Sequence, residues 1–210
     1  MEKMNKPSTG QVQQRTFEAQ IRAKEDDSRT VELSFSSELP VERWYGQEVL
    51  SHDAGAIDMS RLLDVGVVLF SHGRDPLYGK MPIAKIEKAW LDEVEMKGRA
   101  EITFDDDGDS EKVFQKVKKG FIKGVSVGYS VSNWEEVVAG KKSANGRFQG
   151  PAYIAMKWEP FEISIEPTPA DAMVGVGREI MGQDTRENNP NTQSYVIENM
   201  KHRVELKTKF

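Results

Sequence analysis

The stretch Gly124-Val125-Ser126-Val127-Gly128-Tyr129-Ser130-Val131 decides the fold class of this chain. It places a serine between two glycines, where a nucleophilic hydroxyl is not crowded by neighbouring side chains. In an α/β-hydrolase this motif joins a strand to a helix, and the catalytic histidine follows the serine. Here alternating apolar residues continue past the second glycine, and the only later histidine is His202. The pattern therefore predicts a serine on a β-strand, with any catalytic histidine upstream.

A second feature makes this serine informative. The apolar run Val67-Val68-Leu69-Phe70 leads through Ser71 to His72, one of only three histidines in the chain. A strand end can hold a histidine rigidly as a general base. Taken alone, each residue has a simpler structural explanation, since glycine in a strand commonly marks a bulge or a close backbone approach. The conjunction of Ser126 and His72 indicates a serine hydrolase.

The composition restricts the class of protein. The 210 residues carry a net charge of −5, with an isoelectric point near 5.4. Nucleic-acid binding needs a concentrated basic surface, and the basic clusters at 116–119 and 141–142 are short, so nucleic acid is not an expected partner. The absence of cysteine excludes disulfides, zinc–thiolate sites and a cysteine nucleophile, and it fits a reducing cytoplasm. We expect no cofactor and no metal.

The length favours one folded domain with polar ends. Residues 1–15 are polar, lack an apolar secretory segment and are predicted to be a disordered arm. Residues 16–182 form the predicted domain, and residues 183–210 a polar linker and tail. The apolar runs have the length of strands, far below that of a membrane span, so no membrane contact is expected.

Alternation of apolar and polar residues predicts most of the strands. Residues 17–23 and 31–35 alternate on either side of a turn and predict a hairpin. Further strands are expected at 67–70, 83–90, 99–104, 121–131 and 158–166, and helices at 58–63 and 110–119. The class is therefore α+β and mainly antiparallel β, a β-barrel of about six or seven strands decorated by a few helices.

The acidic run at 105–110, Asp-Asp-Asp-Gly-Asp-Ser, has some likeness to a calcium loop. It lacks the EF-hand spacing and the closing glutamate. Acidic residues also favour the start of a helix, where they complement the helix dipole. The run therefore predicts a helix start capped by Asp109 or Ser110, and Asp58 is the corresponding cap for the helix at 58–63.

Four stretches resemble the prohead serine proteases of tailed bacteriophages, a family related in fold to the herpesvirus assemblin proteases. They are residues 51–58, residues 68–72, residues 110–129 with Val-Ser-Val-Gly-Tyr at the end, and residues 158–171 with Glu-Ile-Ser-Ile and Pro-Ala-Asp. Order and spacing agree with the family, and the resemblance covers roughly residues 16–180. It implies an assemblin-like barrel.

The resemblance implies particular roles for site residues. The nucleophile of the family falls on Ser126 and its histidine on His72, with Glu162 as the acidic third member. Asp75 is a local alternative for that third position, and His52 is another because the herpesvirus enzymes use a second histidine. Histidine would take the serine proton during attack on a peptide carbonyl and return it to the leaving amine. Backbone N–H groups or an arginine would stabilise the oxyanion, and the sequence identifies none of them.

The resemblance also implies a biological role. A family member cleaves the scaffold segment, the major capsid protein and itself inside the immature capsid, in the host cytoplasm, and association with further copies of itself is compatible with this role. The polar ends suit self-cleavage, because unfolded segments enter an active-site groove readily. The tail 183–210 would anchor the protease, continue a scaffold-like region, or be simply disordered.

Two other functions remain open from the sequence. The first is a non-catalytic capsid-assembly or scaffold protein with the same barrel, which the presence of both His72 and Ser126 disfavours. The second is a small-ligand-binding β-barrel, which predicts an apolar interior cavity and no reactive serine.

Overall fold

The computed structural model describes residues 6–18, 21–23 and 28–167. These residues form ten strands, two α-helices and one short 3-10 helix. In chain order the elements are β1 (Val12–Glu18), β2 (Ile21–Ala23), β3 (Thr30–Ser37), β4 (Val41–Arg43), β5 (Gly46–Leu50), α1 (Ser60–Val65), β6 (Val67–Phe70), η1 (Ser71–Gly73), β7 (Ala84–Asp92), β8 (Lys97–Phe104), α2 (Gly108–Lys118), β9 (Gly124–Val137) and β10 (Ala152–Glu166).

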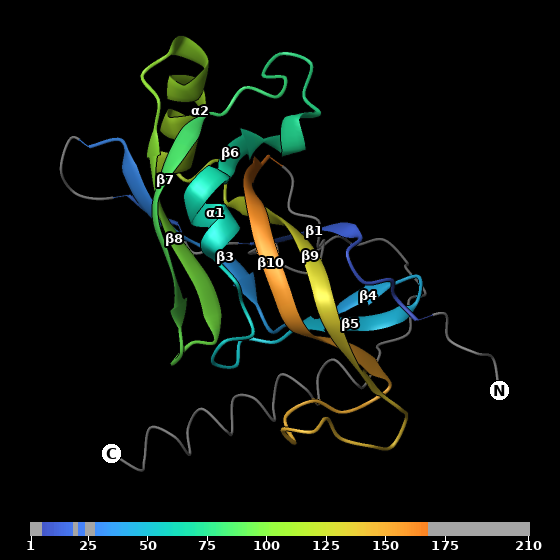
Figure 1. Cartoon of the computed structure of the whole chain (residues 1–210). Coiled ribbons are helices and arrows are strands. Elements are labelled where there is room, and N and C mark those ends of the chain that lie inside the picture. Colours follow the sequence, from blue (N-terminus) through green and yellow to red (C-terminus); the bar gives the residue numbers. More distant parts are fainter. Residues whose placement is uncertain (1–5, 19–20, 24–27, 168–210) are drawn as a thin grey trace, which may run out of the picture.

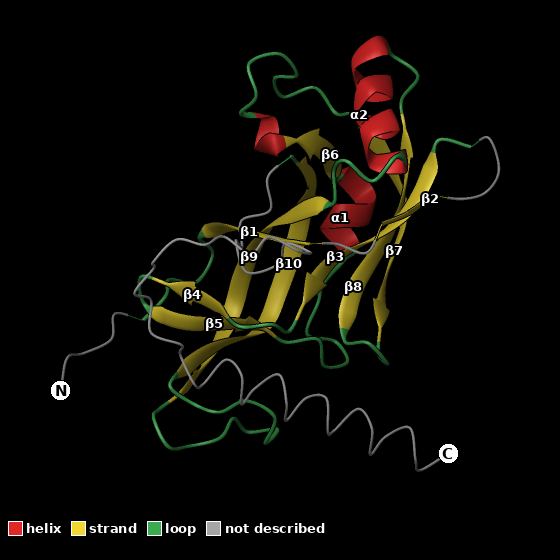
Figure 2. Cartoon of the chain, turned by 180° about the vertical axis from the view of Figure 1, so that it is seen from behind, coloured by secondary structure: helices red, strands yellow, loops and turns green. Residues whose placement is uncertain are grey.

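All ten strands belong to one curled sheet in the order β1-β9-β10-β6-β7-β8-β3-β2, with β5 attached to β10 and β4 to β5 (Figure 1). Only the pairings of β10 with β5 and with β6 are parallel. The predicted, mainly antiparallel β class is confirmed, and the sheet curls into a half-barrel (Figure 2). β1 and β2 stand at opposite ends of this strand order, but only two residues separate them in the sequence. The Cα atoms of Glu18, at the end of β1, and Ile21, at the start of β2, therefore lie within about 11 Å of each other.

The described strands outnumber the predicted six or seven, and the reason is local. β4 and β5 lie in the segment 41–50, which lacks the alternation that predicts a strand. The alternating stretch 17–23 is divided between β1, which pairs with β9, and β2, which forms the expected hairpin with β3.

The boundary of the disordered arm was predicted too far along the chain. β1 begins at Val12 and pairs with β9 through Glu18, so residues 12–15 are part of the sheet. Residues 12–15 are mostly polar, so they lack the apolar alternation that predicts a strand. Backbone pairing with β9 holds much of this segment in the sheet. The Arg15 side chain is buried. The predicted tail 183–210 lies outside the described residues.

The two helices lie close to their predicted positions, but their first residues differ. α1 starts at Ser60, and the Asp58 carboxylate accepts a hydrogen bond from the Ser60 backbone N–H. Asp107 caps α2 by accepting from two backbone N–H groups, two residues before Asp109, the earlier of the two predicted caps. The acidic run is therefore the start of a helix. In the part of the chain that is described, neither helix is long and apolar enough to cross a membrane.

The long strands β9 and β10 have one face in the core and one face outside it. Val125, Val127, Tyr129 and Val131 of β9 are fully or almost fully buried in the main apolar cluster. Because successive side chains of a strand point to opposite faces, Ser126 and its flanking glycines lie on the other face. Ile163 and Ile165 of β10 likewise face the core, which turns Glu162, Ser164 and Glu166 toward the same outer face as Ser126.

β10 lies between the two strands that carry the predicted histidine and serine. On one side it runs parallel to β6, with Ile165 opposite Phe70. On the other side it runs antiparallel to β9, with Ser164 opposite Ser126. The end of β6 and the start of β9 therefore lie on either side of the last residues of β10.

Candidate active site

His72 follows β6 in a backbone conformation that few residues adopt. Ser71, His72 and Gly73 have φ values of 51°, 56° and 65°, in the left-handed region. This region costs a non-glycine residue roughly 1–2 kcal/mol, so surrounding contacts must hold it. The His72 backbone N–H donates to Ser164 Oγ at 2.8 Å, which fixes this turn to β10. From this turn the imidazole reaches Glu162 of β10 and Ser126 of β9.

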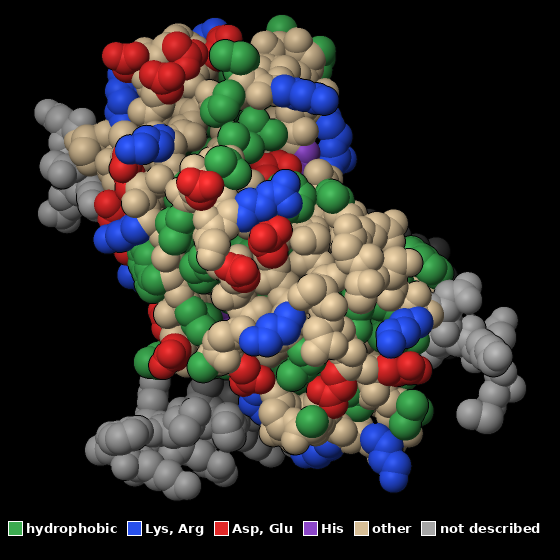
Figure 3. Space-filling view, viewed as in Figure 1, with side chains coloured by type: hydrophobic (Ala, Val, Ile, Leu, Met, Phe, Trp, Pro, Cys, Tyr) green, Lys and Arg blue, Asp and Glu red, His purple; other side chains and the backbone are tan. Residues whose placement is uncertain are grey.

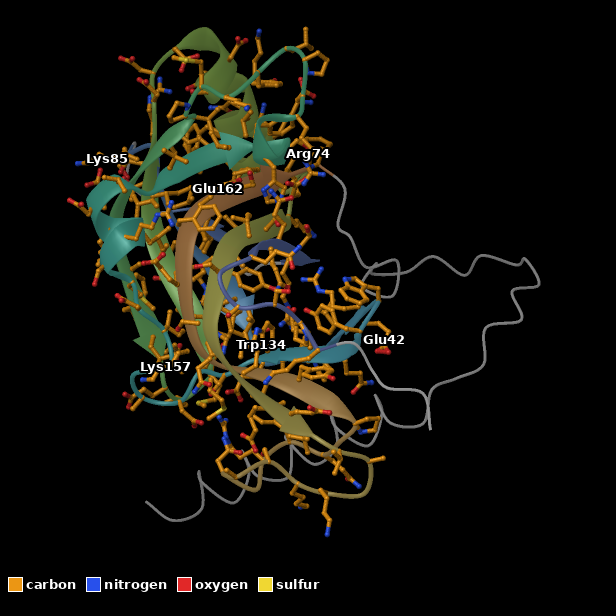
Figure 4. All side chains as sticks on the ribbon, turned by 45° about the vertical axis from the view of Figure 1, so that its right-hand side comes forward. Glu42, Arg74, Lys85, Trp134, Lys157 and Glu162 are labelled. Carbon is orange, nitrogen blue, oxygen red and sulfur yellow. The ribbon has the colours of Figure 1, made fainter. Side chains whose placement is uncertain are left out.

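Three predicted residues meet in one hydrogen-bonded chain. His72 Nε2 lies 2.7 Å from Ser126 Oγ, and His72 Nδ1 lies 2.7 Å from Glu162 Oε1. The histidine side chain is 4 % exposed and that of Glu162 is 10 % exposed, so water screens these contacts weakly. Figure 4 shows Glu162 at the same end of the β9–β10 pair as Arg74, with Lys157 and Trp134 toward the other end.

The two glycines of the serine motif make room for carboxylate-bearing residues of β10. A Cβ atom at Gly128 would lie 3.1 Å from Glu162 Oε2 and 3.2 Å from Glu162 Cβ. A Cβ atom at Gly124 would lie 2.6 Å from the Glu166 carbonyl oxygen. The motif is thus explained by close approach of a neighbouring strand and not by a nucleophile elbow.

The Glu162 carboxylate is held in its ionised form. Burial acts to raise the pKa of Glu162, but the hydrogen bond and positive charge of His72, with the Ser164 hydroxyl and Arg74, outweigh burial and lower the pKa. Ser164 Oγ donates to Glu162 Oε1 at 2.9 Å. An ionised acceptor at Nδ1 favours the tautomer with its proton there, which leaves the Nε2 lone pair for Ser126.

The two alternative third members lie elsewhere. Asp75 Oδ1 accepts the Leu77 backbone N–H at 2.8 Å and so closes a turn in the loop after η1. His52 is 1 % exposed and directs its ring nitrogens to Ser36 Oγ and the Leu50 carbonyl oxygen. Burial lowers the pKa of His52 to about 3, so this ring is neutral at physiological pH.

Two residues beside His72 were not predicted as site residues. Ser164 bonds both the His72 backbone N–H and the Glu162 carboxylate. Glu166 Oε1 lies 3.4 Å from His72 Nε2, on the serine side of the ring. Their alternation with Glu162 on one face of β10 was visible in the sequence, but their distance from His72 depends on the parallel pairing of β6 with β10.

Ser126 is fully buried, so a substrate must displace some of its neighbours to reach it. Its hydroxyl also lies 3.0 Å from the Arg15 carbonyl oxygen of β1, to which it donates. A hydroxyl has one proton, so donation to Arg15 and donation to His72 Nε2 exclude each other. Only the second arrangement prepares the serine for attack.

The surrounding surface carries charges of both signs. On the face shown in Figure 3, acidic and basic side chains are interspersed. On the outer face of β9 and β10, a cavity of about 560 Å³ is lined by Ser130 and Ser132, by Lys157 and Glu159, and by the segment 55–58. Within residues 6–18, 21–23 and 28–167, no group of three or more His, Asp or Glu side chains is placed to hold a metal ion.

This arrangement has the parts of a general-base-activated nucleophile: a hydroxyl, an imidazole within hydrogen-bond distance, and an ionised carboxylate that orients the imidazole. Residues 41–182 match the family described as caudovirus prohead serine protease.

The chain belongs to the caudovirus prohead serine protease family.

A curated relative adds a second connection to the capsid. The major capsid protein of Halomonas phage phiHAP-1 is 36% identical to this chain over 146 residues. The aligned part is 70% of this chain but only 23% of that protein. No solved structure matches the chain.

Proposed function

We propose that this protein is a serine endopeptidase of prohead maturation, with Ser126 as nucleophile, His72 as general base and acid, and Glu162 as the carboxylate that orients His72. The observation that supports this most strongly is the continuous contact from Glu162 through both nitrogens of His72 to Ser126, each at 2.7 Å. A serine that served only as a small strand residue would not require an oriented imidazole.

The proposed chemistry follows from this geometry. Ser126 Oγ attacks a peptide carbonyl carbon while its proton passes to His72 Nε2, and the resulting imidazolium is stabilised by Glu162. Nε2 then gives the proton to the leaving amine, and the C–N bond breaks to leave an acyl-enzyme. Water deprotonated by Nε2 attacks the acyl group and restores the serine hydroxyl.

The proposed substrates are the scaffold segment, the major capsid protein and the protease itself, inside the immature capsid. Family membership supports a role in capsid maturation. The relative that is named a major capsid protein supports capsid protein as a partner. Self-cleavage and the location in the host cell rest on the family alone.

The test is intact mass spectrometry over time on the full chain, co-expressed with its capsid and scaffold proteins. Ser126→Ala removes the hydroxyl and leaves the strand unchanged. The control is Ser132→Ala, on the same outer face of β9, where the hydroxyl donates to the Lys157 carbonyl oxygen. We expect defined fragments from the wild type and from Ser132→Ala, and none from Ser126→Ala.

Two outcomes contradict the proposal. Equal fragmentation in the wild type and Ser126→Ala means that Ser126 is not the nucleophile. Assembled shells without any fragmentation favour the alternative, a non-catalytic assembly protein with the same fold.

A further inference from the structure

Glu166 places a second carboxylate against the same imidazole. Its side chain is 13 % exposed, and its Oε1 lies 3.4 Å from His72 Nε2. Its other oxygen, Oε2, accepts a hydrogen bond from Ser71 Oγ at 3.3 Å. The histidine therefore has a carboxylate on each side: Glu162 at Nδ1 and Glu166 at Nε2.

Glu166 Oε1 is buried and has no hydrogen-bond partner among the described residues. A buried carboxylate oxygen without a hydrogen bond is costly, so such a group needs a nearby positive charge or a proton. The Nε2–H of a protonated His72 provides that charge, because 3.4 Å is within ion-pair distance. The pair is thus more favourable when the imidazole is protonated.

The surroundings of Glu166 allow its charge to vary. The charged groups that act on it are His72 and Arg74, both favouring the ionised form, and Glu162, which opposes it. On β9 it faces Gly124 and Ser126, which do not titrate, and Glu18 of β1 stands opposite Gly124 in the register. Burial is the largest influence and raises the pKa of Glu166.

We propose that Glu166 is a positioning residue that regulates this site through His72, by attracting the Nε2 proton and competing with Ser126 for that nitrogen. The inference rests on the proposed function, in which Nε2 is the base. In the catalytic cycle the proton still passes from Ser126 to Nε2 and then to the leaving amine. Glu166 acts by its charge and neither gains nor loses a proton in that cycle.

The consequence is a pH dependence of the free base. An ionised Glu166 favours the imidazolium electrostatically, so it opposes the neutral imidazole that accepts the Ser126 proton. Removal of this charge shifts the neutral form of His72 to lower pH. An opposite charge within about 4–6 Å typically moves a titration by one unit or more.

The experiment follows the His72 ring directly by NMR, in the full chain with isotope-labelled histidine. The chain has three histidines, and His72→Gln identifies the resonance of interest by its loss. We expect Glu166→Gln to move the midpoint of the His72 titration to lower pH by about one unit. Glu166→Asp retains the charge but moves it away from His72 by one methylene. Its midpoint should lie between those of the wild type and Glu166→Gln.

Two controls separate charge from structure. Glu159→Gln makes the same change on β10, but this carboxylate pairs with Arg61 and not with His72, so its midpoint should match the wild type. Ser71→Ala removes the hydroxyl that bonds Glu166 without changing the charge, and it should move the midpoint much less than Glu166→Gln does.

An unchanged midpoint in both Glu166 variants overturns the inference, as does a movement of equal size in Glu159→Gln. The NMR readout requires no proteolysis, so this failure is distinct from failure of the proposed function. Where wild-type cleavage is measurable, the acid limb of kcat/KM should move to lower pH in Glu166→Gln by the same amount as the NMR midpoint.

Discussion

The closeness of Gly128 to Glu162 leads to a quantitative prediction for Gly128→Ala. The added Cβ would lie 3.0 Å from Phe161 Cε2, 3.1 Å from Glu162 Oε2 and 3.2 Å from Glu162 Cβ. The Phe161 ring is partly exposed, and the Arg61 guanidinium lies 4.8 Å from its centroid. Glu162 belongs to β10, which pairs with a strand on each side, so its Cβ atom is held in place. The close contact with the new Cβ is therefore relieved by movement of the Glu162 carboxylate by a few tenths of an ångström.

This movement acts on the contact that orients His72. The Nδ1–Oε1 distance is 2.7 Å, and a few tenths of an ångström bring it past the usual range for a charge-assisted hydrogen bond. We expect kcat/KM for cleavage of the capsid protein to fall about 10- to 100-fold, since small misplacements of catalytic groups have effects of this size. Overpacking should also lower the free energy of unfolding by about 1–3 kcal/mol.

The assay combines cleavage kinetics with urea unfolding of the same preparations. Gly108→Ala is the matched control, because nothing lies within 4 Å of its added Cβ and the position begins α2. That variant should cleave normally and gain at most about 1 kcal/mol from helix propensity. Wild-type activity in a folded Gly128→Ala protein would refute the assignment of Glu162 as the orienting carboxylate.

Three further predictions follow. Glu162→Gln should lower kcat/KM by about 10³- to 10⁴-fold, since the amide favours the wrong tautomer. The pKa of Glu162 is lowered in the folded state, so its ionised form stabilises the fold above pH 4.5. The difference in unfolding free energy between the wild type and Glu162→Gln, measured with urea, should therefore shrink as the pH falls below 4.5. Ser164→Ala leaves the His72 N–H without its acceptor and should cost about 1–3 kcal/mol in urea unfolding, with reduced cleavage. Arg147 donates two hydrogen bonds to the buried Glu38 carboxylate. Arg147→Ala should therefore lower the free energy of unfolding in urea by about 3 kcal/mol. The pH profile of cleavage should not change.

Much of the site could be predicted from the sequence because side-chain direction in a strand is a local property. The alternation in β9 determines that Ser126 faces away from Val125 and Val127. The alternation in β10 puts Glu162 on one face for the same reason. The continuation of the strand past Gly128 also excluded the hydrolase elbow without knowledge of the fold.

Only the tertiary structure shows which of the three candidate third residues lies beside His72. Glu162, Asp75 and His52 were all compatible with the sequence, since each carries a suitable group. Only the parallel register of β6 with β10 brings His72, the second residue after β6, to Glu162, 90 positions away. The same structure buries His52 beside Ser36 and uses Asp75 in a turn.

The sequence by itself therefore determined the strand-borne serine, its histidine and the mainly β class, because these follow from short-range periodicity and from a motif order shared with a family. The tertiary structure decided which carboxylates meet the histidine, why both glycines are needed, and that β1 starts at Val12. These depend on the register between strands distant in sequence, which the packing of the whole core fixes and no local pattern encodes.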